Sequence, residues 1–153
     1  MEVRDQIDIE APRQLVFEVF RDLENAPRRV QGIERVEVLE GPAMLDVGTR
    51  WRETRKMLGK EADEVMLVTA LEENTSYRVE AESRGTKYET SYTFEDTADG
   101  TRVTMTFRGT PVSLAARIMN VVGVLFAGAT RKMLRADLVD LKAACELQAT
   151  SQG

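Results

Sequence analysis

Residues 50–71 read RWRETRKMLGKEADEVMLVTAL, two runs with a side-chain period of two on either side of Gly59-Lys60. A period of two is the pattern of a β-strand that buries one face. A glycine-containing step between two such runs is typical of a β-hairpin with a two-residue turn. The stretch therefore predicts two long antiparallel strands, at residues 50–58 and 61–71.

The same period continues on both sides of this hairpin. It predicts a short first strand over residues 3–9 and further strands at 33–39, 76–83, 87–95 and 102–108. Ala11-Pro12 opens a helix with an apolar stripe up to Leu23, and a helical turn is expected near residues 28–31. After Pro111 the chain is predicted to be helical to about Gln148, and residues 149–153 are expected to fray.

This order of elements predicts the fold class. Consecutive strands joined by tight turns run antiparallel, and a sheet with one apolar face needs a cover. The long C-terminal helix is the one predicted element large enough to supply it. We therefore expect an α+β fold in one domain, residues 1–148, with a seven-stranded curved antiparallel sheet around that helix. One or two short helices follow the first strand.

Composition excludes several classes of function. The 153 residues contain 26 acids and 21 bases, a net charge of -5, which argues against general nucleic-acid binding. The absence of histidine excludes histidine triads and histidine metal sites. The single cysteine, Cys145, excludes an internal disulfide. We expect no metal and no cofactor.

One apolar stretch, residues 112–129, resembles a membrane span at first sight. It carries Arg117 and Asn120 and is shorter than the about 20 apolar residues that a span requires. A buried helix is the better interpretation, so no transmembrane segment is expected. The N-terminus lacks the apolar core of a signal peptide, and a cytoplasmic protein is expected.

Three stretches carry a resemblance to a known family: IEAPRQLVF at residues 9–17, GTRWRET at 48–54 and DGTRVT at 99–104. With the order of elements, they resemble the START-like (SRPBCC) superfamily, and most closely its polyketide cyclase/dehydrase and lipid transport family. The resemblance covers roughly residues 2–147. It implies a helix-grip fold with an apolar cavity between the sheet and the C-terminal helix. It also implies a hydrophobic small-molecule ligand, but no invariant catalytic motif.

The predicted turn fixes which hairpin residues share a face. It places Leu58 opposite Glu61 and Trp51 opposite Val68. The more apolar face is turned inward and carries Trp51, Met57, Ala62, Met66, Val68 and Ala70. The later strands add the inward residues Tyr77, Val79, Ala81, Tyr88, Thr90, Tyr92, Phe94, Val103, Met105 and Phe107.

The same choice of face turns charged residues inward. Glu53 and Arg55 could hold the polar end of a mostly apolar ligand. Alternatively, Arg55 forms a cross-strand ion pair with Glu64. Glu53 faces Met66 in this register and lacks a partner there, although a buried carboxylate needs one.

The C-terminal helix carries a core stripe of Leu134, Leu138, Leu141 and Cys145, in which the cysteine is expected to be an inert packed thiol. Toward the helix start the stripe meets small residues such as Gly123, which leave room for a ligand or mark a kink. The full predicted ligand-binding set is Trp51, Glu53, Arg55, Met66, Val68, Tyr77, Tyr88, Tyr92, Phe107, Ile118, Val122, Gly123 and Phe126.

Three functions remain open at this level. The first is a carrier or sensor for a lipid, isoprenoid or polyketide-like molecule. The second is a cyclase, aromatase or dehydratase with Glu53 as general base, although no catalytic constellation is visible and we favour a binding protein. The third is a protein-interaction module that docks through an exposed Met44-Leu45 loop or through the apolar start of the C-terminal helix. A homodimer is left open.

Overall fold

The computed structural model describes residues 1–57 and 59–152, with side chains at all of them except 57, 116 and 118–126. Four predicted site residues of the C-terminal helix, Ile118, Val122, Gly123 and Phe126, therefore lie outside the described residues.

The elements follow the predicted order. They are β1 (Glu2–Ile9), α1 (Arg13–Arg21), α2 (Ala26–Arg29), β2 (Ile33–Glu40), β3 (Arg50–Met57), β4 (Lys60–Glu72), β5 (Ser76–Ser83), β6 (Thr86–Asp96), β7 (Thr101–Pro111) and α3 (Leu114–Gln152). The predicted fold class is confirmed. The described part of α3 continues through residues 149–152, which are helical where fraying was expected.

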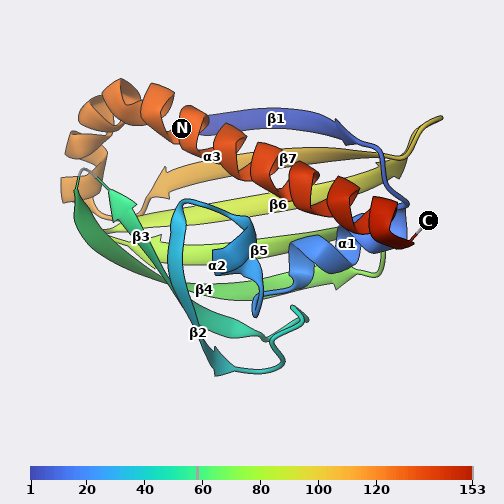
Figure 1. The fold of residues 1–153 in the computed structure, drawn as a ribbon. Coiled ribbons are helices and arrows are strands. Elements are labelled where there is room, and N and C mark those ends of the chain that lie inside the picture. The colour runs from blue at the N-terminus through green and yellow to red at the C-terminus, as the bar shows by residue number, and fades with distance from the viewer. Residues whose placement is uncertain (58, 153) are drawn as a thin grey trace.

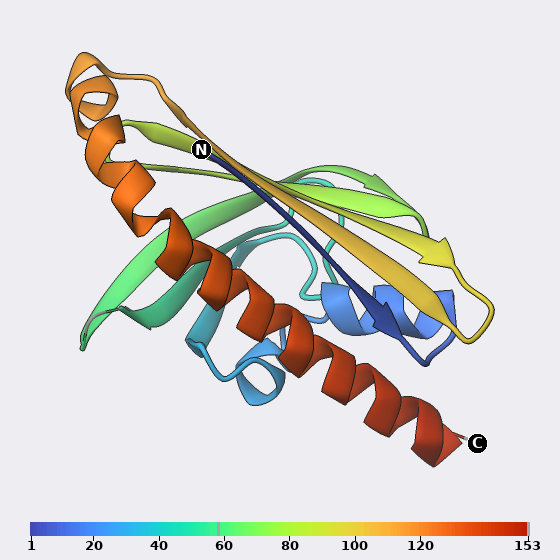
Figure 2. The same cartoon turned by 90° about the horizontal axis from the view of Figure 1, so that it is seen from above.

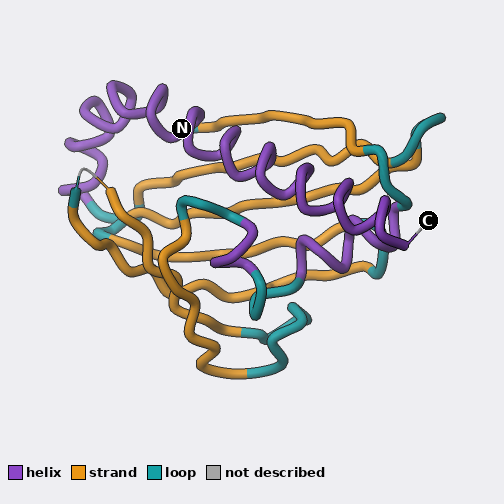
Figure 3. The backbone as a smooth tube through the Cα atoms, viewed as in Figure 1, coloured by secondary structure: helices purple, strands orange, loops and turns teal. Residues whose placement is uncertain are grey.

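The described strands form one antiparallel sheet in the order β1-β7-β6-β5-β4-β3-β2, so β1 and β2 are its edges. The three helices of the described chain lie on one side of this sheet, and α3 runs across its concave face (Figure 1). The view from above shows α1 between α3 and the sheet at one end (Figure 2). The tube view shows short turns between the strands from β3 to β7 and a longer loop between β2 and β3 (Figure 3).

The predicted register of the β3–β4 hairpin is wrong by two residues. Met57 pairs with Lys60, and each β3 residue faces a β4 partner two positions earlier than predicted. Gly59 has φ +79°, so the glycine takes the second position of the loop, where a left-handed conformation is needed, and not the first. Because the shift is even, every side chain stays on its predicted face, but its cross-strand partner changes.

A β-bulge in β4 overturns one predicted inward position. The register shifts between Val68 and Ala70, after which Ala70 pairs with Arg78 and Leu71 pairs with the buried Tyr77. The extra residue moves the rest of the strand by one position. Ala70 therefore faces outward, and Leu71 packs against the core in its place.

The core is densest where α1 meets the sheet. The ring of Phe17 lies edge-on to Phe94 at 5.2 Å, and that of Phe20 lies edge-on to Phe94 at 5.3 Å and to Tyr92 at 5.8 Å. Such edge-to-face pairs are favourable beyond the area they bury.

The core stripe of α3 is confirmed at three of its four positions. Leu134, Leu138 and Cys145 are buried, and Leu141 is partly buried. Burial raises the pKa of the Cys145 thiol to about 12. A thiol with so high a pKa carries almost no thiolate at neutral pH, as expected of an inert packed cysteine. No helix in the described residues is long and apolar enough to cross a membrane.

Alanine substitutions at two glycines, one in a close contact and one beside open space, are expected to change stability in opposite directions. A Cβ at Gly100 would overlap the carbonyl oxygen of Ile9 and lie 2.8 Å from the amide nitrogen of Ala11, whereas a Cβ at Gly128 on α3 would meet nothing within 4 Å. Gly100→Ala is therefore expected to lower the free energy of unfolding by about 1–3 kcal/mol. Gly128→Ala is expected to raise it by about 1 kcal/mol, because alanine is the better helix former.

Urea denaturation of both variants and the parent measures these changes, and the two substitutions serve as each other's control. A Gly100→Ala protein as stable as the parent would contradict the close approach of the β6–β7 turn to the end of β1.

Candidate functional site

The candidate site starts on the inward face of β3. Trp51, Glu53 and Arg55 alternate along the strand and therefore point to the same side. Glu53 is only 7% exposed, and Arg55 donates a hydrogen bond of 2.8 Å from Nε to its Oε2. The carboxylate that lacked a partner in the predicted register thus finds one on its own strand, two residues away.

The guanidinium of Arg55 also reaches across to α3. Its Nη2 and Nη1 donate to Asp137 Oδ2 and Oδ1 at 2.7 and 3.2 Å, a two-pronged ion pair. Burial disfavours the charge of Arg55, but the hydrogen bonds and charges of Asp137 and Glu53 outweigh burial and raise its pKa. The backbone of Gly32 makes room for this group, since a Cβ there would lie 3.0 Å from Arg55 Nη1.

The alternative in which Arg55 pairs with Glu64 across the hairpin is wrong. Ala62 is the residue opposite Arg55, and Glu64 is opposite Glu53. Glu64 makes no hydrogen bond to any described residue and is half-buried. Burial, and then the charge of Glu53, raise the pKa of the Glu64 carboxyl. We call Glu53, Arg55, Glu64 and Asp137 the polar cluster.

Asp137 is the site residue that the sequence reasoning missed. It lies three residues after Leu134 and four before Leu141, so it borders the predicted core stripe of the helix. An acid in that position was the available signal, because it must find a partner inside or at the edge of the core. Burial raises the pKa of the Asp137 carboxyl even against the opposing influence of Arg55.

Tyr77 and Tyr92 belong to the group of aromatic side chains next to α1. The rings of Tyr77 and Tyr92 lie 4.9 Å apart, and the buried Tyr77 hydroxyl donates to the carbonyl oxygen of Phe20 at 3.4 Å. The Tyr92 hydroxyl has no hydrogen bond to a described residue. Burial raises the pKa of Tyr92, and the charges of Asp137 and Glu53 raise it further.

The apolar part of the predicted site is only partly covered. Met66, Ala81 and Tyr88 lie side by side across β4, β5 and β6 and are half-buried. We call these three residues the inner row. The neighbouring pair Val68 and Val79 is fully buried. The inward face of the sheet is therefore sealed near α1 and incompletely covered along the inner row.

Two other predicted site residues, Trp51 and Phe107, differ in how far they are buried. Trp51 is 4% exposed and packs in the core, but its indole Nε1 is buried without a hydrogen-bond partner among the described residues. Phe107 is half-buried, and its ring stacks on that of Tyr88 at 5.6 Å.

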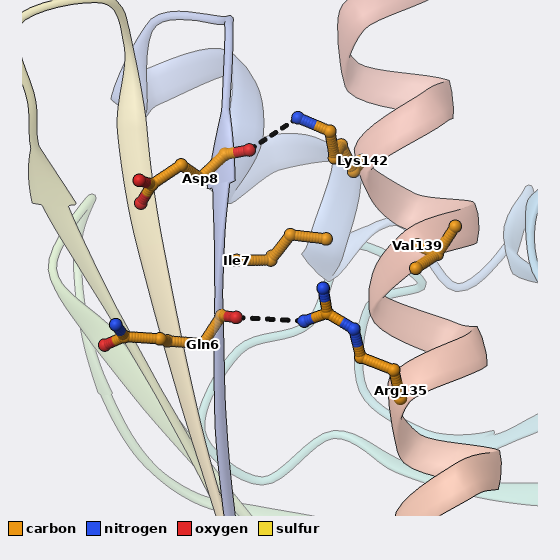
Figure 4. A pocket seen from close by; sticks show the side chains of 6 residues that line it. All are labelled: Gln6, Ile7, Asp8, Arg135, Val139 and Lys142. Carbon is orange, nitrogen blue, oxygen red and sulfur yellow. Dashed lines mark hydrogen bonds between the residues drawn. The ribbon is translucent and has the colours of Figure 1, made fainter.

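A separate groove lies between β1 and α3. It has a volume of about 410 Å³ and is lined by Gln6, Ile7, Asp8, Arg135, Val139 and Lys142, none of which was predicted as a site residue (Figure 4). Arg135 donates to the carbonyl oxygen of Gln6 at 3.0 Å, and Lys142 donates to that of Asp8 at 2.6 Å. These bonds cap the outer edge of β1 and fix α3 beside it.

The two opposed glutamates are expected to affect stability in opposite ways. The folded-state pKa of Glu64 lies above its ordinary value of 4.5, so the folded chain holds this proton to higher pH than the unfolded chain does. The contribution of Glu64 to the free energy of unfolding is therefore lost as the pH rises from 4.5 through its folded-state pKa. Glu64→Gln should be more stable than the parent at neutral pH, and the difference should vanish below pH 4.5.

Glu53→Gln is the matched comparison, because it removes the same charge one strand away. It weakens the hydrogen bond to Arg55 and should cost about 1.5–3 kcal/mol at neutral pH. Denaturant titrations of both variants from acid to neutral pH provide the measurement. Equal destabilisation by both substitutions would contradict the assignment of Glu64 as the carboxyl without a partner.

The chain was compared with families of known proteins and with solved structures. Residues 1–146 match the profile of the family described as "Polyketide cyclase / dehydrase and lipid transport". No curated protein is similar enough to count as a match.

Several solved structures share the fold. TTHA0849 from Thermus thermophilus is 22% identical over 94% of this chain and 95% of its own, with a TM-score of 0.77. Ginseng major latex-like protein 151 from Panax ginseng is 14% identical over 95% and 97%, with a TM-score of 0.74.

The di-domain ARO/CYC StfQ from the steffimycin biosynthetic pathway is 10% identical over 97% of this chain, with a TM-score of 0.78. This chain spans only 51% of that protein. At these identities the three structures establish the fold alone, while the profile match covers almost the whole chain. The resemblance seen in the sequence is thus confirmed, and the chain belongs to the polyketide cyclase/dehydrase and lipid transport family.

Proposed function

We propose that this protein binds a hydrophobic small molecule between the sheet and α3, as a carrier or sensor. The observation that carries the proposal is the inner row, whose apolar and aromatic side chains face the side of α3 and remain half-buried. Apolar surface that the fold itself does not cover favours occupation by an apolar ligand, because burying it is favourable. The polar cluster gives such a site a few fixed polar groups that orient the ligand.

An enzyme with Glu53 as general base has less support. A base must present a free carboxylate to the proton that it removes, and Glu53 already accepts a hydrogen bond of 2.8 Å from Arg55. If chemistry does take place here, Glu64 is the better candidate for proton transfer, because its carboxyl has no hydrogen-bond partner among the described residues.

The interaction-module hypothesis named two surfaces, an exposed Met44-Leu45 loop and the apolar start of α3. For the loop, the expected exposure is confirmed at Met44 and wrong at Leu45. Met44 is 40% exposed, but Leu45 is 2% exposed and belongs to the core. The Leu45 amide donates to the carbonyl oxygen of Arg21 at 2.9 Å, and Arg21 Nε donates to the carbonyl oxygen of Leu45 at 2.7 Å. The loop is fastened to α1, and one exposed methionine does not make a docking surface.

Two alanines on one hairpin allow a matched test of the binding site. Ala81 is the middle residue of the inner row and faces inward, whereas Ala70 faces outward opposite Arg78, and both are half-buried. Ala81→Leu should fill part of the ligand space and weaken binding of the neutral apolar dye Nile red about tenfold or more. Ala70→Leu adds the same volume on the other face and should leave binding unchanged.

Dye fluorescence measures the binding, and thermal unfolding confirms that both variants are folded. Extraction of the protein purified from its own host, followed by mass spectrometry, should also yield an apolar molecule. Loss of dye binding in both variants, or in neither, would contradict a site along the inner row.

A further inference from the structure

The charges inside the site are unbalanced. The polar cluster contains three carboxyl groups, on Glu53, Glu64 and Asp137, and one guanidinium, on Arg55. Arg55 is already committed to two of the three acids through three hydrogen bonds. An anionic ligand group brought here would have to displace one of those acids from Arg55 and remain beside the others, in a partly buried setting where like charges repel more strongly than in water.

Hydrogen-bonding groups without partners lie in the same region. The Glu64 carboxyl makes no hydrogen bond to a described residue, and it lies opposite Glu53 and two residues before Met66 of the inner row. Trp51 lies two residues before Glu53 on the same face of β3, and its buried Nε1 also has no acceptor among the described residues. A buried donor without an acceptor is unusual and costly. A buried donor without an acceptor suits a ligand oxygen, and the surplus of carboxyl groups on the same face favours an uncharged one.

From these two observations we propose that the polar cluster makes the site selective by charge. It accepts apolar ligands whose polar group is an uncharged hydroxyl, which donates a hydrogen bond to Glu64, and it excludes carboxylate ligands. Glu64 is the residue that sets this selectivity, since it is the one carboxyl of the cluster with no hydrogen bond to Arg55. The inference rests on the proposed function and specifies its ligand class.

The test compares two probes with the same chain length, 1-dodecanol and dodecanoate, at neutral pH. Isothermal titration calorimetry gives the affinities, and the fluorescence of Trp51, the single tryptophan, gives a second readout. Dodecanol should bind the parent protein at least about tenfold more tightly than dodecanoate.

Two variants assign the selectivity to named groups. Glu64→Gln keeps the shape of the side chain and removes its charge, and it should reduce the preference for dodecanol several-fold by improving the binding of dodecanoate. Glu82→Gln is the control, because it changes the net charge equally from an exposed position one strand away on the outer face, and it should leave the preference unchanged.

The outcomes separate this inference from the function beneath it. If dodecanoate binds the parent as tightly as dodecanol, and Ala81→Leu abolishes both, the ligand site stands and the charge selectivity is overturned. An equal change of preference in Glu82→Gln and Glu64→Gln would also overturn it, since net charge alone would then be the cause. If neither probe binds, both proposals fail.

Discussion

The guanidinium of Arg55 links the sheet to α3 through its ion pair with Asp137. This contact between the two layers is polar and not apolar. Along the other side, α3 packs on β1 and β7, and Arg135 and Lys142 fasten it to the edge of β1. Toward β3 the connection is the ion pair of Arg55 with Asp137. The helix is thus held at both sides of the concave sheet by charged groups, and the inner row between them stays half-buried. An ion pair fixes the position of the helix at one point because its geometry is specific. Hydrophobic burial is non-directional and favours contact of the helix with the whole face.

This arrangement explains why a protein of this size leaves part of its apolar face half-covered. The end near α1 is filled by aromatic rings in edge-on contact, and it supplies a rigid floor. The end along Met66, Ala81 and Tyr88 has no such filling among the described side chains.

The fold could be predicted from the sequence because it depends on periodicity, and periodicity is local. Strand faces depend on odd or even position, so the inward set stayed correct up to the bulge after Val68, even with a hairpin register that was wrong by two residues. The register itself depended on which loop position Gly59 occupies, and no alternation of side chains reports that. The bulge at Val68 was missed for a related reason. A bulge leaves no signal in the type of residue, but it exchanges the inward and outward faces of the residues that follow, as Ala70 and Leu71 show.

The site was less predictable because its key contact joins residues far apart in the chain. Periodicity placed Glu53 and Arg55 on the inward face, but Asp137 lies on another element, 82 positions after Arg55. An acid beside a leucine stripe indicates that a partner exists without saying which residue it is. In the same way, the exposure of Met44 and the burial of its neighbour Leu45 depend on backbone hydrogen bonds to α1, which leave no mark in the sequence.

The buried thiol on α3 gives this protein a built-in reporter. Cys145 is inaccessible while the helix rests on the sheet, and its high pKa keeps it in the unreactive protonated form. Thiol-specific reagents can modify it only in molecules whose helix has lifted. The rate of alkylation therefore counts opening events of the helix directly, with no second cysteine in the chain to confuse the signal.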